Sequence, residues 1–290
     1  MITGSIVALV TPMQPDGSID WTALERLLEH HVAAGTKALG VTGTTGESAT
    51  LTVPEHCDVI RFSVAQAAGR IPVIAGTGSN STHEAIELTV AAAEAGADAS
   101  LLVTPYYNRP TQEGLYQHFV TVAAAVNLPI ILYNVPGRTA VDLSNDTVLR
   151  LTDVDNIVGL KDATGNVERG ADLIARAPDS FAVYSGDDPT ALELMKRGGK
   201  GNVSVTANVA AEVMAKMCDL ALAGDFDAAT ALDERMRALH QALFVEANPI
   251  PVKWALLEQG LISSGIRLPL VPLSEEYHDA VRDALEKLNA

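Results

Sequence analysis

The chain has 290 residues, of which 48 % are hydrophobic and 19 % are charged, and its formal charge at pH 7 is −16. This composition is typical of a globular protein with a large apolar core, and it excludes a disordered chain. The negative charge repels phosphate backbones and anionic lipids, so neither nucleic acids nor membranes are expected as partners. With no long apolar run and no secretion signal, and with two cysteines that fit no disulfide framework, we expect a cytoplasmic protein.

Short apolar runs alternate with amphipathic segments along most of the chain. The apolar character of each run is continuous, which is typical of strands buried on both faces of a parallel sheet. These predicted strands are Ile6–Val10, Ala38–Val41, Pro72–Ala75, Ser100–Val103, Ile130–Asn134, Ile157–Leu160, Phe181–Ser185 and Val203–Val205. Helices are predicted between them, for example over Trp21–Ala34, Pro54–Ala68, Thr82–Ala95 and Gln112–Val126.

Consecutive strand–helix units without a linker favour an α/β fold of the closed (β/α)8 TIM-barrel type over an open doubly wound sheet. After the last predicted strand, further helices are predicted over Asn208–Ala223, Asp225–Phe244, Pro251–Gln259 and Glu275–Leu288. One of these helices completes the barrel. We therefore predict a catalytic barrel over residues 1–225 and a C-terminal extension of about three helices, packed on the barrel, over residues 226–290.

Polar residues that directly follow the predicted strands are the candidates for chemistry, because reacting groups in such barrels lie at the carboxyl ends of the strands. Lys161 follows the sixth strand, where a desolvated lysine can attack a carbonyl group. Its position alone also suits a lysine paired with a carboxylate such as Asp162. Tyr133 ends the fifth strand, where its hydroxyl can transfer protons, although a tyrosine of the core would give the same pattern.

Two loops carry further candidates. The loop GTTGES at 43–48 offers backbone amides to an anion and hydroxyls for proton transfer, or it is a plain loop that caps a helix. Arg138 in YNVPGRT at 133–139 suits bidentate capture of a carboxylate, or a surface salt bridge. The histidines form no ligand cluster, and the adjacent His30 and His31 are expected on the polar side of a helix. We predict no metal site, and lysine with tyrosine and hydroxyls indicates imine chemistry.

The motifs GTTGES, YNVPGRT and GLKDATG (159–165) together resemble those of the pyruvate-dependent class I aldolases. This family includes the dihydrodipicolinate synthases and the N-acetylneuraminate lyases, and the similarity extends over nearly the whole chain. The resemblance implies a lyase that holds pyruvate as a Schiff base on Lys161, with Tyr133 as proton donor and acceptor and without metal, pyridoxal phosphate or other cofactor. It also implies a proton relay through Thr44 and Tyr107, with Tyr107 supplied by a neighbouring subunit.

The resemblance also implies how substrates are bound. Thr45 binds the carboxylate of pyruvate, and Gly186 and Val203 make backbone contacts near the imine. Arg138 matches the arginine with which the dihydrodipicolinate synthases hold the carboxylate of L-aspartate 4-semialdehyde, and the neuraminate lyases lack this GRT pattern. The implied reaction is the condensation of pyruvate with L-aspartate 4-semialdehyde to 4-hydroxy-tetrahydrodipicolinate, in the diaminopimelate and lysine pathway.

Regulation and assembly are implied by the family as well. Some members are inhibited by L-lysine at a dimer interface, and the matching positions of this chain are Ser48, Ala49, His56, Asn80, Glu84 and Tyr106. Val53 departs from the histidine that some lysine-sensitive members have there. The family also implies a homotetramer, built as a dimer of tight dimers.

Other functions stay open at this stage. A pyruvate-dependent aldolase of a sugar acid would use the same chemistry, and Arg138 argues against that acceptor. A catalytically silent, amino-acid-binding barrel would not need an imine-forming lysine. A pyridoxal phosphate enzyme built on Lys161 would need a phosphate-binding loop after the last two strands, and the sequence has no clear one.

Overall fold

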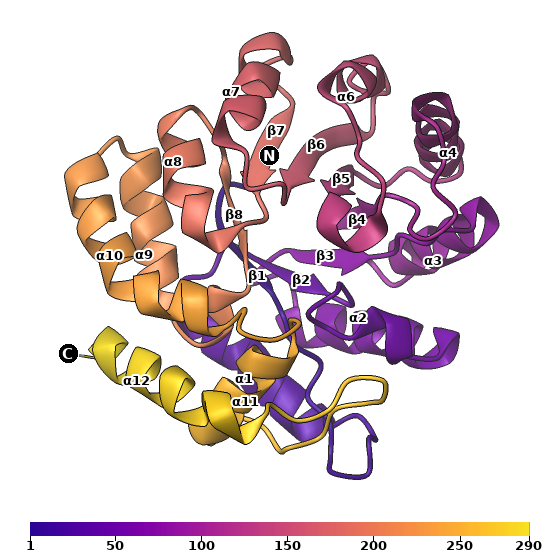
Figure 1. Cartoon of the computed structure of the whole chain (residues 1–290). Helices are drawn as coiled ribbons and strands as arrows, with labels where there is room; N and C mark the ends of the chain where they lie inside the picture. Colours follow the sequence, from indigo (N-terminus) through magenta and orange to yellow (C-terminus); the bar gives the residue numbers. More distant parts are fainter. Residues whose placement is uncertain (290) are drawn as a thin grey trace.

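A computed structural model describes residues 1–289 and shows a closed barrel of parallel strands, in the order β1 to β8, surrounded by helices (Figure 1). The strands are β1 Gly4–Ala8, β2 Ala38–Val41, β3 Val73–Gly76, β4 Ala99–Val103, β5 Ile130–Asn134, β6 Ile157–Asp162, β7 Ala182–Ser185 and β8 Gly201–Ser204. The predicted (β/α)8 fold is therefore confirmed.

The helices begin and end at residues that satisfy their free backbone groups. In α2, for example, the Thr52 side chain and the Glu55 backbone and side chain form a reciprocal capping box. The helices up to β8 are α1 Trp21–Ala33, α2 Val53–Ala67, α3 Thr82–Glu94, α4 Gln112–Ala124, α5 Pro136–Thr139, α6 Asn145–Leu151, α7 Val167–Arg176 and α8 Ala191–Lys196. Those after β8 are α9 Ala211–Leu222, α10 Phe226–Ala242, α11 Ile250–Glu258 and α12 His278–Asn289. None of the helices within residues 1–289 is long and apolar enough to cross a membrane.

Alternate residues of each strand face the barrel interior and the surrounding helices, as the pleat of a strand requires. In β5, Ile131 and Tyr133 pack in the interior cluster, whereas Ile130 and Leu132 pack in a separate cluster with the outer helices. In β6, Leu160 belongs to the outer cluster, so the next residue, Lys161, faces inward. The alternation of inward and outward residues along β6 therefore places the Lys161 side chain inside the barrel.

The observed strands β1 and β8 differ from the predicted ones because their first paired residues are not apolar. β1 and β8 pair from Gly4↔Gly201 to Val7↔Ser204, so both strands begin earlier than the apolar runs Ile6–Val10 and Val203–Val205. A β-carbon on Gly201 would lie 2.1 Å from the Gly4 carbonyl oxygen, so this close pairing requires a glycine that an apolar pattern does not detect.

Two further expectations are corrected near helix ends. The helix predicted over Asn208–Ala223 begins later, at Ala211, and Asn208 instead ends a 3-10 turn over Thr206–Asn208. The Asn208 side chain donates to Ala8 O and accepts from Val10 N. His31 is fully buried in the core and does not lie on the polar side of α1. There its Nδ1 has a polar partner in the buried Thr36 hydroxyl, at 2.9 Å.

The helices α10, α11 and α12 lie together at one side of the barrel, near α1 and α9 (Figure 1). One apolar cluster includes Leu24 of α1, Met236 of α10 and Val281 of α12. Ion pairs also join the chain after α10 to the barrel: Lys253 pairs with Glu47 in the loop after β2, and Arg267 pairs with Glu55 in the first turn of α2 at 2.6 Å. The structure does not test the division at residues 225 and 226, which stays a prediction.

Candidate active site

Lys161 lies near the carboxyl end of β6 with only 6 % of its surface exposed. Its strand neighbour on β5 is Tyr133, and its Nζ lies 4.1 Å from the centre of the Tyr133 ring. Within residues 1–289, no carboxylate forms an ion pair with this lysine. Asp162, which follows it, points to the other face of the strand, accepts from the Thr164 N–H at 2.9 Å and lies 4.0 Å from Arg169 Nε. The alternative of a Lys161–Asp162 pair is therefore not observed.

A cavity of about 120 Å³ opens around Lys161 at the carboxyl ends of the strands. It is smaller than the sites of drug-sized ligands, which have roughly 300–1,000 Å³, so it suits a molecule of a few heavy atoms. The structure brings together here most of the predicted catalytic and substrate-binding residues: Lys161, Tyr133, Thr44, Thr45, Arg138, Gly186 and Val203.

The loop after β2 holds Thr44 and Thr45 in a defined backbone conformation. Thr42 and Glu47 have positive φ angles of 52° and 55°, which non-glycine residues adopt only when their surroundings stabilise them. The Thr11 hydroxyl donates to Gly46 O at 2.7 Å, and the buried Glu47 carboxylate pairs with Lys253 and accepts from the Arg267 N–H at 3.1 Å. Residues distant in the sequence therefore hold the loop in place.

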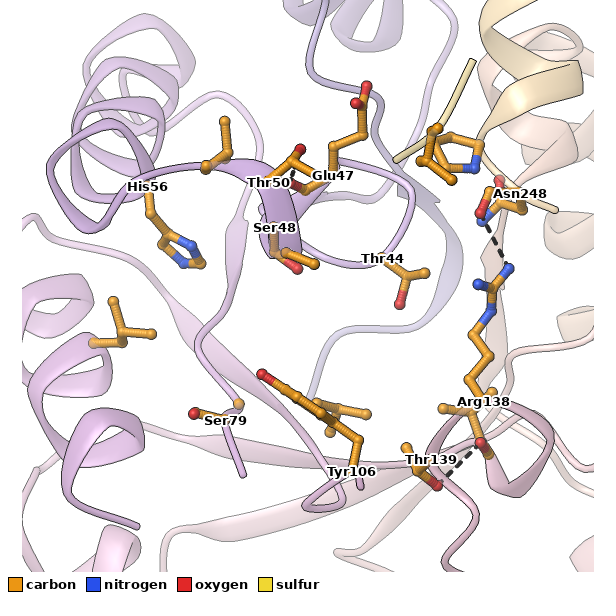
Figure 2. Close-up of a pocket in the computed structure, with 18 of the residues that line it drawn as sticks. Thr44, Glu47, Ser48, Thr50, His56, Ser79, Tyr106, Arg138, Thr139 and Asn248 are labelled. Atoms are coloured by element: carbon orange, nitrogen blue, oxygen red, sulfur yellow. Dashed lines mark hydrogen bonds between the residues drawn. The ribbon is translucent and has the colours of Figure 1, made fainter. Parts of the chain in front are cut away.

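Arg138 and Thr45 are linked by a residue that the sequence analysis did not identify. Arg138 Nη2 donates to the backbone carbonyl of Asn248 at 3.1 Å, a contact drawn as a dashed line in Figure 2. Asn248 Nδ2 donates to the Thr45 hydroxyl oxygen at 3.0 Å. Because Asn248 follows no predicted strand, no local signal marks it as part of the site.

A larger cavity, of about 340 Å³, is shown in Figure 2. The two cavities share Thr44, Arg138 and Asn248 among their lining residues. Of the predicted regulatory residues, those that line the larger cavity are Ser48, Ala49, His56, Glu84 and Tyr106. Asn80 does not line it, but its side chain donates to the backbone carbonyl of Tyr106 at 3.1 Å.

Two titratable side chains of the larger cavity have partners of their own. His56 Nε2 lies 2.7 Å from Gly76 O, and burial lowers the pKa of this histidine below its usual value. The Glu84 carboxylate accepts from the Ser79 hydroxyl at 2.7 Å. The cavity thus presents a carboxylate and hydroxyl groups, together with the half-exposed Val53.

Tyr107 is the predicted catalytic residue that its own chain does not bring to Lys161. Its side chain is 88 % exposed, its φ is 74°, and it lines neither cavity.

In the part of the chain described by the structure, no group of His, Cys, Asp and Glu side chains could hold a metal ion.

A buried lysine that faces a tyrosine at the strand ends of a (β/α)8 barrel defines a lyase of the Schiff-base aldolase class. The sequence model of the Dihydrodipicolinate synthetase family matches residues 1–288, so the chain belongs to this family. The family predicted from the three motifs is therefore confirmed.

Known relatives are similar over the full length of the chain. The 4-hydroxy-tetrahydrodipicolinate synthase of Azoarcus sp. (strain BH72) is 60 % identical over 287 residues, which cover 99 % of this chain and 98 % of the relative. The chloride-inhibited dihydrodipicolinate synthase of Acinetobacter baumannii, solved with pyruvate, is 58 % identical with a TM-score of 0.99, covering 100 % of this chain and 99 % of that chain. The enzyme of Cyanidioschyzon merolae, solved with lysine bound, is 40 % identical with a TM-score of 0.96, covering 99 % and 98 %.

Proposed function

We propose that the chain condenses pyruvate with L-aspartate 4-semialdehyde to 4-hydroxy-tetrahydrodipicolinate, through a Schiff base on Lys161. The observation that carries this proposal is the placement of a buried lysine, free of carboxylate partners in residues 1–289, over the ring of Tyr133. The names of the relatives and the pyruvate complex of the Acinetobacter baumannii enzyme support the same reaction.

The proposed mechanism begins when the Lys161 amine attacks the ketone carbon of pyruvate. Tyr133 moves the protons that convert the carbinolamine into an iminium ion and release water. The iminium withdraws electrons, so the methyl group loses a proton and becomes an enamine carbon. That carbon attacks the aldehyde of the second substrate, and the amine of that substrate then displaces Lys161 and closes the ring. No metal or added cofactor takes part in these steps.

Each substrate carboxylate is assigned its own group. The hydroxyl and backbone of Thr45 bind the carboxylate of pyruvate, near backbone contacts from Gly186 and Val203. The guanidinium of Arg138, at the boundary of the two cavities, binds the carboxylate of the semialdehyde. This cation favours an aldehyde acceptor that carries its own carboxylate, as the semialdehyde does, over an uncharged sugar aldehyde.

The proposal includes an assembly in which each site is completed by a neighbour. Thr44 lines both cavities, whereas Tyr107 is exposed and carries a positive φ, which supports its insertion into a neighbouring subunit's relay. We assign the chain to a homotetramer built as a dimer of dimers. We also assign it to the cytoplasm, and two cysteines without a disulfide support a reducing compartment.

L-Lysine is the proposed feedback inhibitor, and the larger cavity is its proposed site. Glu84 would accept from the ammonium group of the ligand. The Cyanidioschyzon merolae relative was solved with lysine bound, which supports L-lysine as the ligand. Calorimetric titration with L-lysine tests it, with Glu84→Gln as the variant that should bind at least about tenfold more weakly, since it removes a charge-assisted hydrogen bond. Equal binding by both proteins would reject the site.

Intact-mass measurement after incubation with pyruvate and borohydride tests the proposed function. The wild type and the control Lys216→Ala, changed at an exposed lysine of α9, should each gain one reduced pyruvyl group. Lys161→Ala should gain none and should lose nearly all turnover with the semialdehyde, while its circular dichroism stays unchanged. An unmodified wild type would reject the Schiff-base mechanism, and trapping without turnover would show that the acceptor is an aldehyde other than the semialdehyde, as in the aldolases of sugar acids.

A further inference from the structure

We propose that Asn248 is a positioning residue that orients the Thr45 hydroxyl toward the carboxylate of pyruvate. This inference rests on the proposed function and assigns a task to a residue outside the three sequence motifs. Asn248 belongs to the segment between α10 and α11, is 5 % exposed, and lines both cavities.

The direction of one hydrogen bond carries the argument. A hydroxyl group has one proton to donate and two lone pairs that accept. Because Asn248 Nδ2 donates to the Thr45 oxygen at 3.0 Å, it occupies a lone pair and leaves the Thr45 proton free to be donated elsewhere. Thr45 lines the cavity that contains Lys161, so a carboxylate bound in that cavity is the acceptor that this proton can reach.

The rest of the Asn248 side chain argues for such a task. Its Oδ1 atom is buried and has no hydrogen-bond partner among residues 1–289. An unpaired buried amide oxygen makes asparagine a costly choice for filling space, and an apolar side chain would avoid that cost. The polar contact that remains is the donation to Thr45.

Asn248 is itself fixed in position. In α11, which begins two residues later, Lys253 pairs with Glu47 in the loop that carries Thr45. The Asn248 carbonyl accepts from Arg138 at 3.1 Å. Any residue at this position retains that carbonyl, so substitution of the side chain separates the effect on Thr45 from the contact with Arg138.

The experiment measures the pyruvate concentration that gives half-maximal borohydride trapping, together with the KM values of both substrates. Asn248→Asp has nearly the same shape but accepts the Thr45 proton and adds a negative charge. It should raise the half-saturating pyruvate concentration about 10- to 100-fold, the range expected when a hydrogen bond to a charged group is lost. Asn248→Ala removes the donor without adding an acceptor, so it should raise the half-saturating pyruvate concentration about threefold to tenfold. The KM for the semialdehyde and the kcat at saturating pyruvate should change less than about threefold in Asn248→Ala, because the contact serves binding in ground and transition states alike.

A double-mutant cycle with Thr45→Val shows whether the effect passes through the hydroxyl. In that background Asn248→Ala should change pyruvate saturation by less than about twofold, because the partner has already been removed. Asn127→Asp adds the same charge at an exposed position of the loop before β5 and should bind pyruvate like the wild type. Asn248→Ser replaces the alanine variant in the cycle if circular dichroism shows that alanine prevents folding.

The outcomes separate this inference from the proposed function. If the wild type traps no pyruvate, the proposed function fails and the inference fails with it. If the wild type traps pyruvate and Asn248→Asp saturates at the same concentration, the inference alone is rejected. The inference would also be rejected if Asn248→Ala raised the half-saturating pyruvate concentration equally in the wild type and in Thr45→Val. Asn248 would then not act through the Thr45 hydroxyl.

Discussion

A β-carbon on Gly186 would lie 2.6 Å from Cε and 2.9 Å from Cγ of Lys161. The aliphatic part of the lysine therefore packs directly on the backbone of the residue that follows β7. This contact and the Tyr133 ring on the neighbouring strand leave the amine a narrow range of positions. The absence of a side chain at position 186 is thus a structural requirement for placing the reactive nitrogen.

We expect Gly186→Ala to lower kcat on the order of 100-fold, because a displacement of about 1 Å of a reacting group has effects of this size. The added methyl group should lower the free energy of unfolding by about 1–3 kcal/mol, the usual cost of overpacking. Gly137→Ala is the control, since its β-carbon would meet no atom within 4 Å. Steady-state kinetics and urea unfolding measure both effects, and normal turnover of Gly186→Ala would contradict the tight contact.

Arg138→Ala should separate the two substrates. We expect unchanged borohydride trapping of pyruvate and a KM for the semialdehyde that is about 10- to 100-fold higher, because a charge-assisted bidentate contact is lost. Arg138→Lys keeps the charge but not the bidentate geometry. Its KM for the semialdehyde should lie between those of the wild type and Arg138→Ala. An unchanged KM for the semialdehyde in the alanine variant would remove Arg138 from the substrate site.

Tyr107→Phe should lower kcat about 100-fold, at the lower end of what a proton-transferring group contributes. Complementation tests whether a neighbour supplies this tyrosine. Mixed subunits of Tyr107→Phe and Lys161→Ala should regain activity, because each mixed dimer forms one site with an intact lysine and an intact tyrosine. Mixtures without any gain in activity, after confirmed subunit exchange, would show that Tyr107 does not act in the neighbouring site.

Lys253→Met should destabilise the protein by about 3–5 kcal/mol, because it leaves the Glu47 carboxylate buried without its cationic partner. Both side chains are almost fully buried, and burial lowers the pKa of Lys253. The double variant Glu47→Gln/Lys253→Met removes both charges and should regain much of the loss. Urea unfolding measures the free energies, and equal stability of the single and the double variant would contradict the coupling.

Stability should fall as the pH is lowered from 7 to 5. Burial, with a contribution from the charge of His30, lowers the pKa of His31 to about 3, and burial lowers the pKa of His118 to about 4. In the unfolded chain histidines titrate near 6.5, so the unfolded state binds more protons between about pH 6.5 and these lower values. Each histidine should cost roughly 2 kcal/mol at pH 5 relative to pH 7.

Thermal unfolding at the two pH values measures this loss. His31→Asn, which retains a polar partner for Thr36, should show a smaller decrease in Tm between pH 7 and pH 5 than the wild type. The control is His83→Asn, at a side chain that is 84 % exposed, and it should follow the wild type. An equal decrease in Tm for His31→Asn and the wild type would show that His31 is not buried in its neutral form.

Much of this protein is determined by local sequence pattern. Continuous apolar runs such as Ile130–Asn134 mark strands buried on both faces, and the residues after them must lie at one end of the barrel. For this reason the sequence predicts that Lys161, Tyr133, Thr44, Thr45 and Arg138 lie at the same end of the barrel, where the structure shows them around one cavity. The boundaries of β1 and β8 could not be predicted in this way, because their pairing begins at glycines that an apolar pattern does not detect.

The tertiary structure alone decided how the chain after α10 supports the site. Asn248 reaches Thr45, and Lys253 reaches Glu47, across more than 200 positions of sequence. It also decided that His31 is buried, which a helix with histidines in its last turn does not indicate. Hydrophobic periodicity reports which face of an element is buried, but it does not specify which distant side chain that face meets, because the partner is selected by packing and hydrogen-bond geometry in three dimensions.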